Sequence, residues 1–420
     1  MKQVDAYAAL KTGKRYVVGI VFYVCLAVIF LIDNSKIAVN SYRLLLLLPA
    51  LIFLAFNFRT QIKVLLHYPA VRWFLLYAGW MSLSLFWGNR PDKIENHLAA
   101  VLSALALIVP VIYFAHHRPS HLVILPLVYI VLGATALGLV LWHWQGWAKL
   151  DRYSLGHGVF DTHIRVGALA ACIVFLSGFV LLNTPRKGSE YIIAALALCV
   201  GLWALMASQS RGAVVLLGVA IAAWLFLHPD RSYFRQQHRK KIGGICILAF
   251  CLMGSTAWAI NCYVQLLHID RGSAGSFFSR GLMDRNFVWE NAWHQFIADP
   301  SRILWGFGWT SSAENTYNRF TANHYHSLYI NTVFYSGFIG LTLLLAYLYH
   351  CIKAGLQNKR HEPWLYLVIG SMAAALFDME TLLVNPSAIM LTFLLPSLLL
   401  IPANTAAAIA NRYKSNTSFS

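Results

Sequence analysis

The sequence predicts an all-α integral membrane protein with about twelve transmembrane helices. Hydrophobic residues make up 59% of the chain and charged residues only 12%, a balance typical of proteins whose main solvent is lipid. Crossing about 30 Å of hydrocarbon takes roughly 20 mainly apolar residues, and such runs recur along the whole chain, residues 1–420, which is therefore predicted to be a single polytopic membrane domain. The runs lie near residues 16–33, 42–57, 70–88, 97–115, 121–142, 164–183, 189–207, 212–228, 242–263, 326–350, 363–379 and 385–402.

The first run is interpreted as a true transmembrane helix. It starts at Tyr16, lacks a small-residue cleavage site and is followed by a second run, which does not fit a cleaved signal peptide. Cytoplasmic loops carry an excess of Lys and Arg, and most of the 33 Lys and Arg residues fall on the side of the termini when both ends are placed inside. The predicted orientation is N-in and C-in.

The formal net charge of +17 indicates contact with anionic lipid rather than with nucleic acid. Its densest cluster runs from Arg231 to Lys241, in a loop predicted to be cytoplasmic, where basic residues are attracted to acidic lipids of the inner leaflet. No nucleic-acid-binding motif accompanies the charge. Membrane lipids are therefore expected partners, and nucleic acid is not.

The seven cysteines are expected to be apolar packing residues. They lie in or beside predicted helices, and the sequence has no Cys-x-x-Cys pair and no metal-ligand spacing. It also has no Asp-x-Asp motif. We therefore predict neither a bound metal ion nor a cofactor.

A long outer loop, residues 264–323, separates the ninth and tenth predicted helices, and loops of this length are usually functional. Apolar residues recur within it at helical spacing, so 282–298 is predicted to be an amphipathic helix ended by Pro300. A turn at 306–309 follows, with Trp305 and Trp309 expected at the membrane interface. The predicted apolar face comprises Met283, Phe287, Val288, Ala292, Phe296 and Ile297, and the polar face Asp284, Arg285, Asn291 and Gln295.

Three polar features are predicted on the outer side. The corner at 208–212 contains Arg211, and an arginine at the edge of a span commonly pairs or marks a ligand path, although it can also snorkel to the interface. Arg285, with Arg280 as a substitute, lies on or near the loop helix, where a solvated charged face is the simpler interpretation.

The third feature is the pair His324 and His326 at the start of the tenth predicted helix. A histidine at a helix end is more often structural than catalytic. Histidine nevertheless titrates near neutral pH without help, which suits a general base. The residues alone leave both interpretations open.

Together these motifs resemble the O-antigen ligases, within the O-antigen ligase and polymerase superfamily of membrane glycosyltransferases. The resemblance covers roughly residues 205–345 and implies a GT-C-like fold with a large periplasmic loop, in the bacterial inner membrane, with the active site facing the periplasm. It rests on Ser208-Gln209-Ser210-Arg211-Gly212, on Arg285 with Trp289, Pro300 and Gly306-Phe307-Gly308, and on His326 with Leu328, Gly337 and Gly340.

The resemblance further implies transfer of an O-antigen glycan from undecaprenyl diphosphate to a sugar hydroxyl of the lipid A core, in lipopolysaccharide biosynthesis. Arg211 and Arg285 match the family's diphosphate-binding arginines, with Arg280 as a further candidate. His326 matches its proposed catalytic histidine, which the family often follows with Asn where this chain has Ser327. The auxiliary candidates are His324, Ser210 and Gln209.

Simple chemistry is compatible with this set. Arginine forks match phosphate oxygens bidentately and can take the place of a divalent metal at the leaving group. A neutral His326, kept neutral by nearby arginines, could take the proton of the acceptor hydroxyl. Without an evident carboxylate nucleophile, direct displacement would invert the anomeric centre. Asp378 and Glu380 are the nearest reserve carboxylates and are expected to be structural or to orient a basic residue.

Two rival functions remain from the sequence. An O-antigen polymerase or a protein O-oligosaccharyltransferase would use the same donor with a different acceptor, and the chain length leans toward a ligase. A lipid-linked glycan transporter would bind anionic substrate without chemistry. Transporters of this kind are often built from inverted repeats with broken helices, and no internal repeat is evident.

Overall fold

The computed structural model describes most of the predicted membrane domain and part of the predicted outer loop. The predicted run 242–263 and the candidates Gln209, Arg280, His324, Asp378 and Glu380 lie outside the described residues. The described residues are 20–32, 35–52, 63, 65–117, 119–143, 162–183, 188–208, 210–227, 283–311, 315–317, 320–322, 325–357, 362–377, 379, 381–383 and 387–401.

Helices account for nearly all of the described backbone. The α-helices are α2 (Ser35–Tyr42), α4 (Pro69–Ser84), α5 (Ile94–His117), α6 (Pro119–His143), α7 (His163–Asn183), α8 (Gly188–Ser208), α9 (Arg211–Leu227), α12 (Met283–Ala298), α13 (Arg302–Trp305), α14 (Leu328–Gln357), α15 (Glu362–Ala374) and α16 (Leu395–Leu399). Short π-helical turns occur at Arg43–Leu47 and Met390–Leu394, and 3₁₀ turns at Leu85–Trp87 and Pro91–Lys93. A small antiparallel hairpin, β1 (Asn315–Tyr317) and β2 (Phe320–Ala322), pairs Asn315 with Ala322 and Tyr317 with Phe320.

The all-α membrane class is confirmed for the described residues, apart from this hairpin. Among the described residues, five helices are long and apolar enough to cross a membrane, and four more are apolar but shorter. The total of twelve spans remains a prediction. The five are Pro91–Ile112, Ile124–Leu141, His163–Leu182, Gly188–Ser208 and Leu328–Gln357, and the shorter four are Ile20–Leu31, Arg211–Leu227, Pro363–Ala374 and Met390–Leu399.

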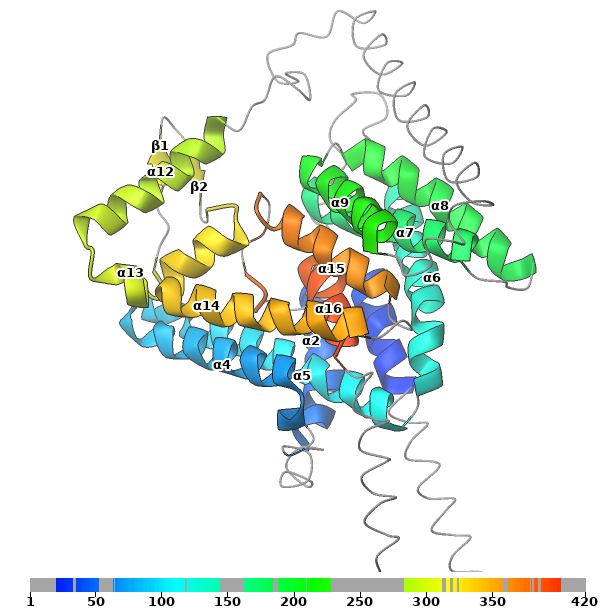
Figure 1. Ribbon diagram of the computed structural model, residues 1–420, viewed down its shortest axis with the longest axis horizontal. Helices are drawn as coiled ribbons and strands as arrows, with labels where there is room; N and C mark the ends of the chain where they lie inside the picture. The colour runs from blue at the N-terminus through cyan, green and yellow to red at the C-terminus, as the bar shows by residue number, and fades with distance from the viewer. Residues whose placement is uncertain are drawn as a thin grey trace, which may run out of the picture.

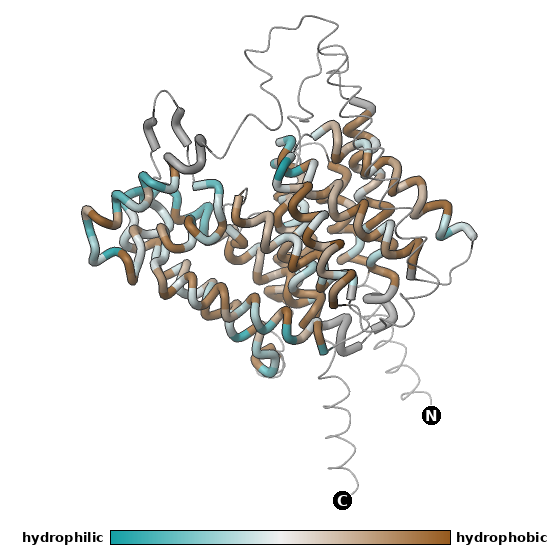
Figure 2. The backbone as a smooth tube through the Cα atoms, turned by 45° about the horizontal axis from the view of Figure 1, so that its top comes forward, coloured by the Kyte–Doolittle hydropathy of each residue, from teal (hydrophilic) through white to brown (hydrophobic). Residues whose placement is uncertain are grey.

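The helices form two neighbouring groups (Figure 1). In one group α6, α7, α8 and α9 pack against each other, and in the other α14 runs along α4. Helix α15 contacts α9 and α14 and so joins the groups. Helices α12 and α13 lie at the end of the second group, against the first half of α14. Hydrophobic residues dominate the bundled helices, whereas hydrophilic residues recur along α12 and its neighbours (Figure 2).

Small residues let the helix backbones approach closely, as is common inside membranes. A Cβ atom added to Gly370 on α15 would lie 2.4 Å from the carbonyl oxygen of Leu216 on α9. One added to Gly201 on α8 would lie 3.0 Å from a methyl group of Val174 on α7. Helices α7, α8, α9 and α15 therefore form a packed unit, and the candidate Arg211 is the first residue of α9 in this unit.

Helix α14 is kinked at Gly337, where φ is +68° and ψ is −172°. A break of this kind interrupts the i to i+4 backbone ladder, and groups freed in an apolar environment need other partners. The carbonyl of Phe334 accepts from Phe307 N at 2.7 Å, and that of Tyr335 accepts from Gly308 N at 3.0 Å. The carbonyl of Ser336 accepts from the indole nitrogen of a tryptophan on α4, Trp80, at 2.8 Å. The three carbonyls before the kink therefore have hydrogen-bond donors in the loop at 306–309 and on α4.

The turn at 306–309, predicted to lie at the membrane interface, packs against other parts of the protein. Trp309 is buried, and its ring lies 4.5 Å from that of His97 on α5. Its backbone N–H donates to the carbonyl of Ser84 at 3.3 Å. Trp305, by contrast, is half exposed. Trp309 is enclosed because its loop folds inward to reach the carbonyls released by the α14 kink, and the level of both tryptophans relative to the membrane remains a prediction.

Candidate functional site

His326 occupies a strained turn directly before α14. Its φ is +53°, and among the residues that the structure describes it is the non-glycine residue with a positive φ. Such a conformation costs about 1–3 kcal/mol and persists where surrounding contacts impose it, often at functional sites. The side chain is partly exposed, whereas its neighbours Tyr325 and Ser327 are buried. The partly exposed His326 is therefore held between two buried residues.

Ser327, the residue that departs from the family pattern, caps α14. Its side-chain oxygen accepts a bond of 3.5 Å from the backbone N–H of Ile330, three residues on, and its carbonyl accepts from Asn331 N at 2.9 Å. Serine is among the residues preferred at this capping position. The Ser327 hydroxyl therefore caps the N-terminus of α14, a role that an asparagine side chain could also fill.

The residue before His326 is held on both sides of its backbone. Tyr325 N–H donates to the side-chain oxygen of Asn331 at 2.9 Å, and the Tyr325 carbonyl accepts from the indole nitrogen of Trp289 at 2.9 Å. The tyrosine ring is buried and lies 4.6 Å from the ring of Phe334. The turn is thereby tied to both α14 and α12.

Helix α12 confirms the predicted loop helix but not all of its predicted face. Ala292 and Phe296 are buried as predicted, whereas Ile297 is 57% exposed. Gln295, assigned to the polar face, donates to the hydroxyl of Tyr325 at 3.2 Å. The apolar pattern did not predict the buried face of α12 correctly, because this face is mixed. Its Trp289 indole and Gln295 amide donate hydrogen bonds to Tyr325 in the turn before α14.

An aromatic cluster completes this docking. The rings of Phe307 and Phe334 are stacked with centroids 4.8 Å apart, and Phe296 lies 5.2 Å from Phe307. Aromatic pairs of this kind contribute about 0.5–1.5 kcal/mol beyond the area that they bury. The cluster joins α12, the turn at 306–309 and α14 into one unit around Tyr325.

Arg285 lies on α12 one turn before Trp289. Residues four apart share a face of a helix, so the backbone of Arg285 belongs to the same side of α12 as the indole that bonds the His326 turn. Its side chain lies outside the described part of the structure. The helix thus brings the second predicted arginine toward the histidine turn at the level of the backbone.

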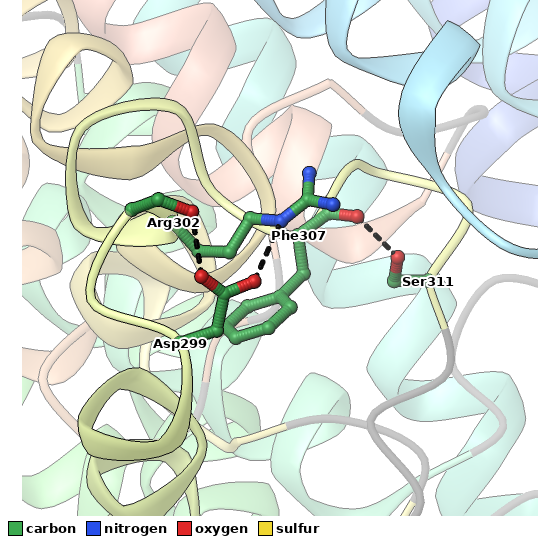
Figure 3. Close-up of polar contacts among 5 residues, drawn as sticks. Asp299, Arg302, Phe307 and Ser311 are labelled. Atoms are coloured by element: carbon green, nitrogen blue, oxygen red, sulfur yellow. Dashed lines mark hydrogen bonds and ion pairs between the residues drawn. The ribbon is translucent and has the colours of Figure 1, made fainter.

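The end of α12 is organised by a polar turn (Figure 3). Asp299 accepts from the hydroxyl of Ser301 at 2.5 Å and from Arg302 Nε at 3.2 Å. These two donors lower the pKa of Asp299 from its ordinary value. The carbonyl of Phe307 accepts from the Ser311 hydroxyl in the same region. The turn directs the chain from α12 into the loop at 306–309.

Arg211 is the first residue of α9, at the corner between α8 and α9. Ser210 caps α9, because its hydroxyl oxygen accepts from Ala213 N at 3.3 Å, and Ser208 donates to the carbonyl of Leu205 at 2.7 Å. Both serines are buried, so they shape the corner, while Arg211 is partly exposed. The N-terminus of a helix carries a partial positive charge that favours anions.

The start of α7 reaches the same corner and adds an arginine that the sequence did not single out. A Cβ atom added to Gly167 would lie 2.6 Å from Ser210 Cβ and 2.7 Å from Ser208 Oγ. Arg165, two residues earlier, is in the first turn of α7, where its N–H donates to Thr162 Oγ1 at 3.3 Å. Two helix N-termini, each with a partly exposed arginine, therefore meet here.

Helix α15 lies between the two halves of the candidate site. It packs along α9, and the Ala375 carbonyl just after its end accepts from Leu328 N, the first residue of α14, at 2.9 Å. Arg211 and His326 are thus carried by elements that share one neighbour. Within the described residues, no three His, Cys, Asp or Glu side chains are grouped so that they could hold a metal ion.

One family model matches the chain: the model described as O-antigen ligase, over residues 193–345. No curated protein matches with significance. The matched range contains Arg211, α12, the turn at 306–309 and His326. It supports the O-antigen ligase family for this chain, and with it a membrane enzyme of the glycosyltransferase type.

Proposed function

We propose that this protein, whose residues 193–345 match the O-antigen ligase family, transfers an O-antigen glycan from undecaprenyl diphosphate to the lipid A-core oligosaccharide. The reaction belongs to lipopolysaccharide biosynthesis and takes place at the periplasmic face of the bacterial inner membrane, with both termini in the cytoplasm. The observation that carries the proposal is the strained, partly exposed His326 within the matched range.

The diphosphate of the donor would bind at the meeting point of α7 and α9. Arg211 can bond phosphate oxygens with a two-pronged fork, and the helix N-termini add a favourable field for an anion. Arg285, with Arg280 as a further candidate, would approach from the α12 side. These cations stabilise the charge that develops on the leaving group, so the proposed mechanism does not route through a metal ion.

His326 would act as the general base. Its imidazole accepts the proton of the acceptor hydroxyl as the hydroxyl oxygen forms a bond to the anomeric carbon. The bond from that carbon to the phosphate oxygen breaks, and undecaprenyl diphosphate leaves with the electron pair. A single displacement inverts the anomeric centre, and a positioned base contributes typically about 10²–10⁴-fold to the rate.

A reconstituted transfer assay tests the proposal and its rivals together. The purified full chain is incubated with glycan on undecaprenyl diphosphate and one acceptor at a time: lipid A core, free lipid-linked glycan or a pilin-like protein. We expect product with lipid A core. Product with lipid-linked glycan alone would instead indicate a polymerase, product with protein an O-oligosaccharyltransferase, and donor movement across vesicles without any product a transporter.

A further inference from the structure

We infer that Trp289 and Asn331 are positioning residues for His326, because they hold both ends of the backbone of the preceding residue, Tyr325, and so impose the left-handed conformation of His326. This inference rests on the proposed role of His326 as base. Neither residue is expected to touch substrate. Their effect would be to set the direction in which the imidazole leaves the backbone.

Asn331 holds the N-terminal side of the turn. Its side chain is fully buried, and both ends of the amide are used. The oxygen accepts from Tyr325 N at 2.9 Å, and the nitrogen donates to the carbonyl of Met379 at 3.3 Å. Because an amide with both ends bonded cannot rotate without losing a buried hydrogen bond, the position of Tyr325 N is fixed relative to α14.

Trp289 holds the other end of the same residue. Its indole N–H donates to the Tyr325 carbonyl at 2.9 Å, and this carbonyl belongs to the peptide plane that ends at His326 N. The plane therefore cannot turn without breaking a bond to α12. The angle φ of His326 is the rotation about its N–Cα bond, measured from this plane. The orientation of the plane is thus set by Trp289, which lies 37 positions earlier in the chain.

The C-terminal side of His326 is equally constrained. Ser327 begins the hydrogen bonds of α14, and Leu328 N donates to Ala375 O at 2.9 Å. His326 and the peptide group after it thus lie between two fixed peptide groups, and His326, with φ of +53°, takes up the change of chain direction. An L-residue with this backbone is less stable than glycine there, so the strain is a measurable signature of the arrangement.

A stability comparison tests this arrangement without any assay of activity. His326→Gly should melt roughly 1–3 °C above His326→Ala, because glycine adopts positive φ without steric cost. In a Trp289→Phe background, which removes the indole donor and keeps an aromatic ring, this difference should shrink by at least half. An unchanged difference in that background, or no difference in the native one, would overturn the inference.

A kinetic comparison tests the positioning itself. Trp289→Phe should lower kcat roughly 10- to 100-fold with donor KM changed less than about threefold, since a displacement near 1 Å can cost about 10²-fold. The matched control is Tyr329→Phe, which removes a 3.0 Å bond to the Met372 carbonyl elsewhere on α14. The control should retain kcat within about twofold. Equal losses of kcat in both variants would show that Trp289 has only a general structural role.

Non-additivity gives a third readout. If Trp289 acts through the imidazole, Trp289→Phe should lower the residual rate of His326→Ala by less than about twofold, because the group that it positions is already gone. A full further loss would contradict the inference. Should Trp289→Phe fail to fold, Asn331→Ser removes the bonds on the other side of Tyr325 and enters the same comparisons. Failure of the wild-type transfer assay would reject the proposed function, while the melting comparison would still decide the positioning.

Discussion

The indole nitrogen of Trp289 lies 2.9 Å from the main-chain oxygen of Tyr325. This bond joins the loop helix that carries Arg285 to the turn that carries His326. Because Arg285 and Trp289 are one helical turn apart, any shift of α12 would move Arg285 and the His326 turn together. Arg285 and the proposed base are therefore coupled through one helix, whereas Arg211 is carried by α9.

Replacement of His326 by alanine should abolish transfer while the protein remains folded and inserted. The expected loss is about 10²–10⁴-fold in kcat, the usual contribution of a general base. Transfer to purified lipid A core, together with size-exclusion behaviour in detergent, provides the measurement. Near-normal product from this variant would reject His326 as the base.

Replacement of Arg211 should weaken donor use. Arg211→Ala is expected to raise donor KM about 10- to 100-fold, because hydrogen bonds to charged groups are worth about 1.5–3 kcal/mol. Arg211→Lys should recover only part of this, since a lysine is a point charge without the fork. Arg285→Ala should act in the same direction.

The matched control for these arginines is Arg302→Ala. Arg302 bonds Asp299 at the exposed end of α12, so its loss should leave donor KM nearly unchanged. A control as defective as Arg211→Ala would point to a general requirement for positive charge instead of a defined diphosphate site.

Arg165 on α7 should also contribute to donor binding. Its helix start adjoins the Ser208 and Ser210 corner, through Gly167, so Arg165→Ala should raise donor KM several-fold and reduce the salt dependence of binding. Arg90→Ala, a change at a partly exposed arginine on a different turn, serves as the control. Donor affinity is measured across a salt series, and identical slopes for the wild type and Arg165→Ala would rule out this role.

The kink in α14 should be intolerant of side chains. A Cβ atom at Gly337 would lie 2.0 Å from the Leu304 carbonyl oxygen, at a φ of +68°. We expect Gly337→Ala to cost at least about 2–4 kcal/mol of stability, since overpacking and backbone strain add. Gly218→Ala on α9 is the control, because its added Cβ meets nothing within 4 Å. Thermal unfolding of the two variants in detergent should differ by several degrees, and similar melting would show that the loop can move away.

The sequence predicted those features that depend on local pattern. Apolar runs located the five long apolar helices that the structure describes, and helical spacing located α12 to within one residue of its start at Met283. The orientation of α12 could not be predicted in full, because Gln295 and Trp289 face the protein for their hydrogen bonds and not for their hydropathy. Trp309 is buried because its loop pairs with the kink of α14. This pairing joins segments that are far apart in the sequence, so no local pattern indicates it.

In the candidate site, too, the residues were predictable from local sequence, whereas their conformation and contacts were not. Residue types and order indicated His326, Arg211 and Arg285, and the family match covers all three. The positive φ of His326 has no signal in the sequence, since histidine rarely adopts it and the cause lies in contacts from α12 and α14. Arg165 was missed because its relation to Arg211 depends on how α7 packs against α9.

The partners of the α14 kink have an order in the chain. Trp80, Phe307 and Gly308 supply the donors to the carbonyls of Phe334, Tyr335 and Ser336, and all three donors precede their acceptors in the sequence. During synthesis they leave the ribosome first, so these three donors are already present when the carbonyls of the kink are made. The kink can therefore form in the membrane before α15 and the C-terminal residues have been translated, whereas Leu328 and Asn331 must wait for their partners Ala375 and Met379.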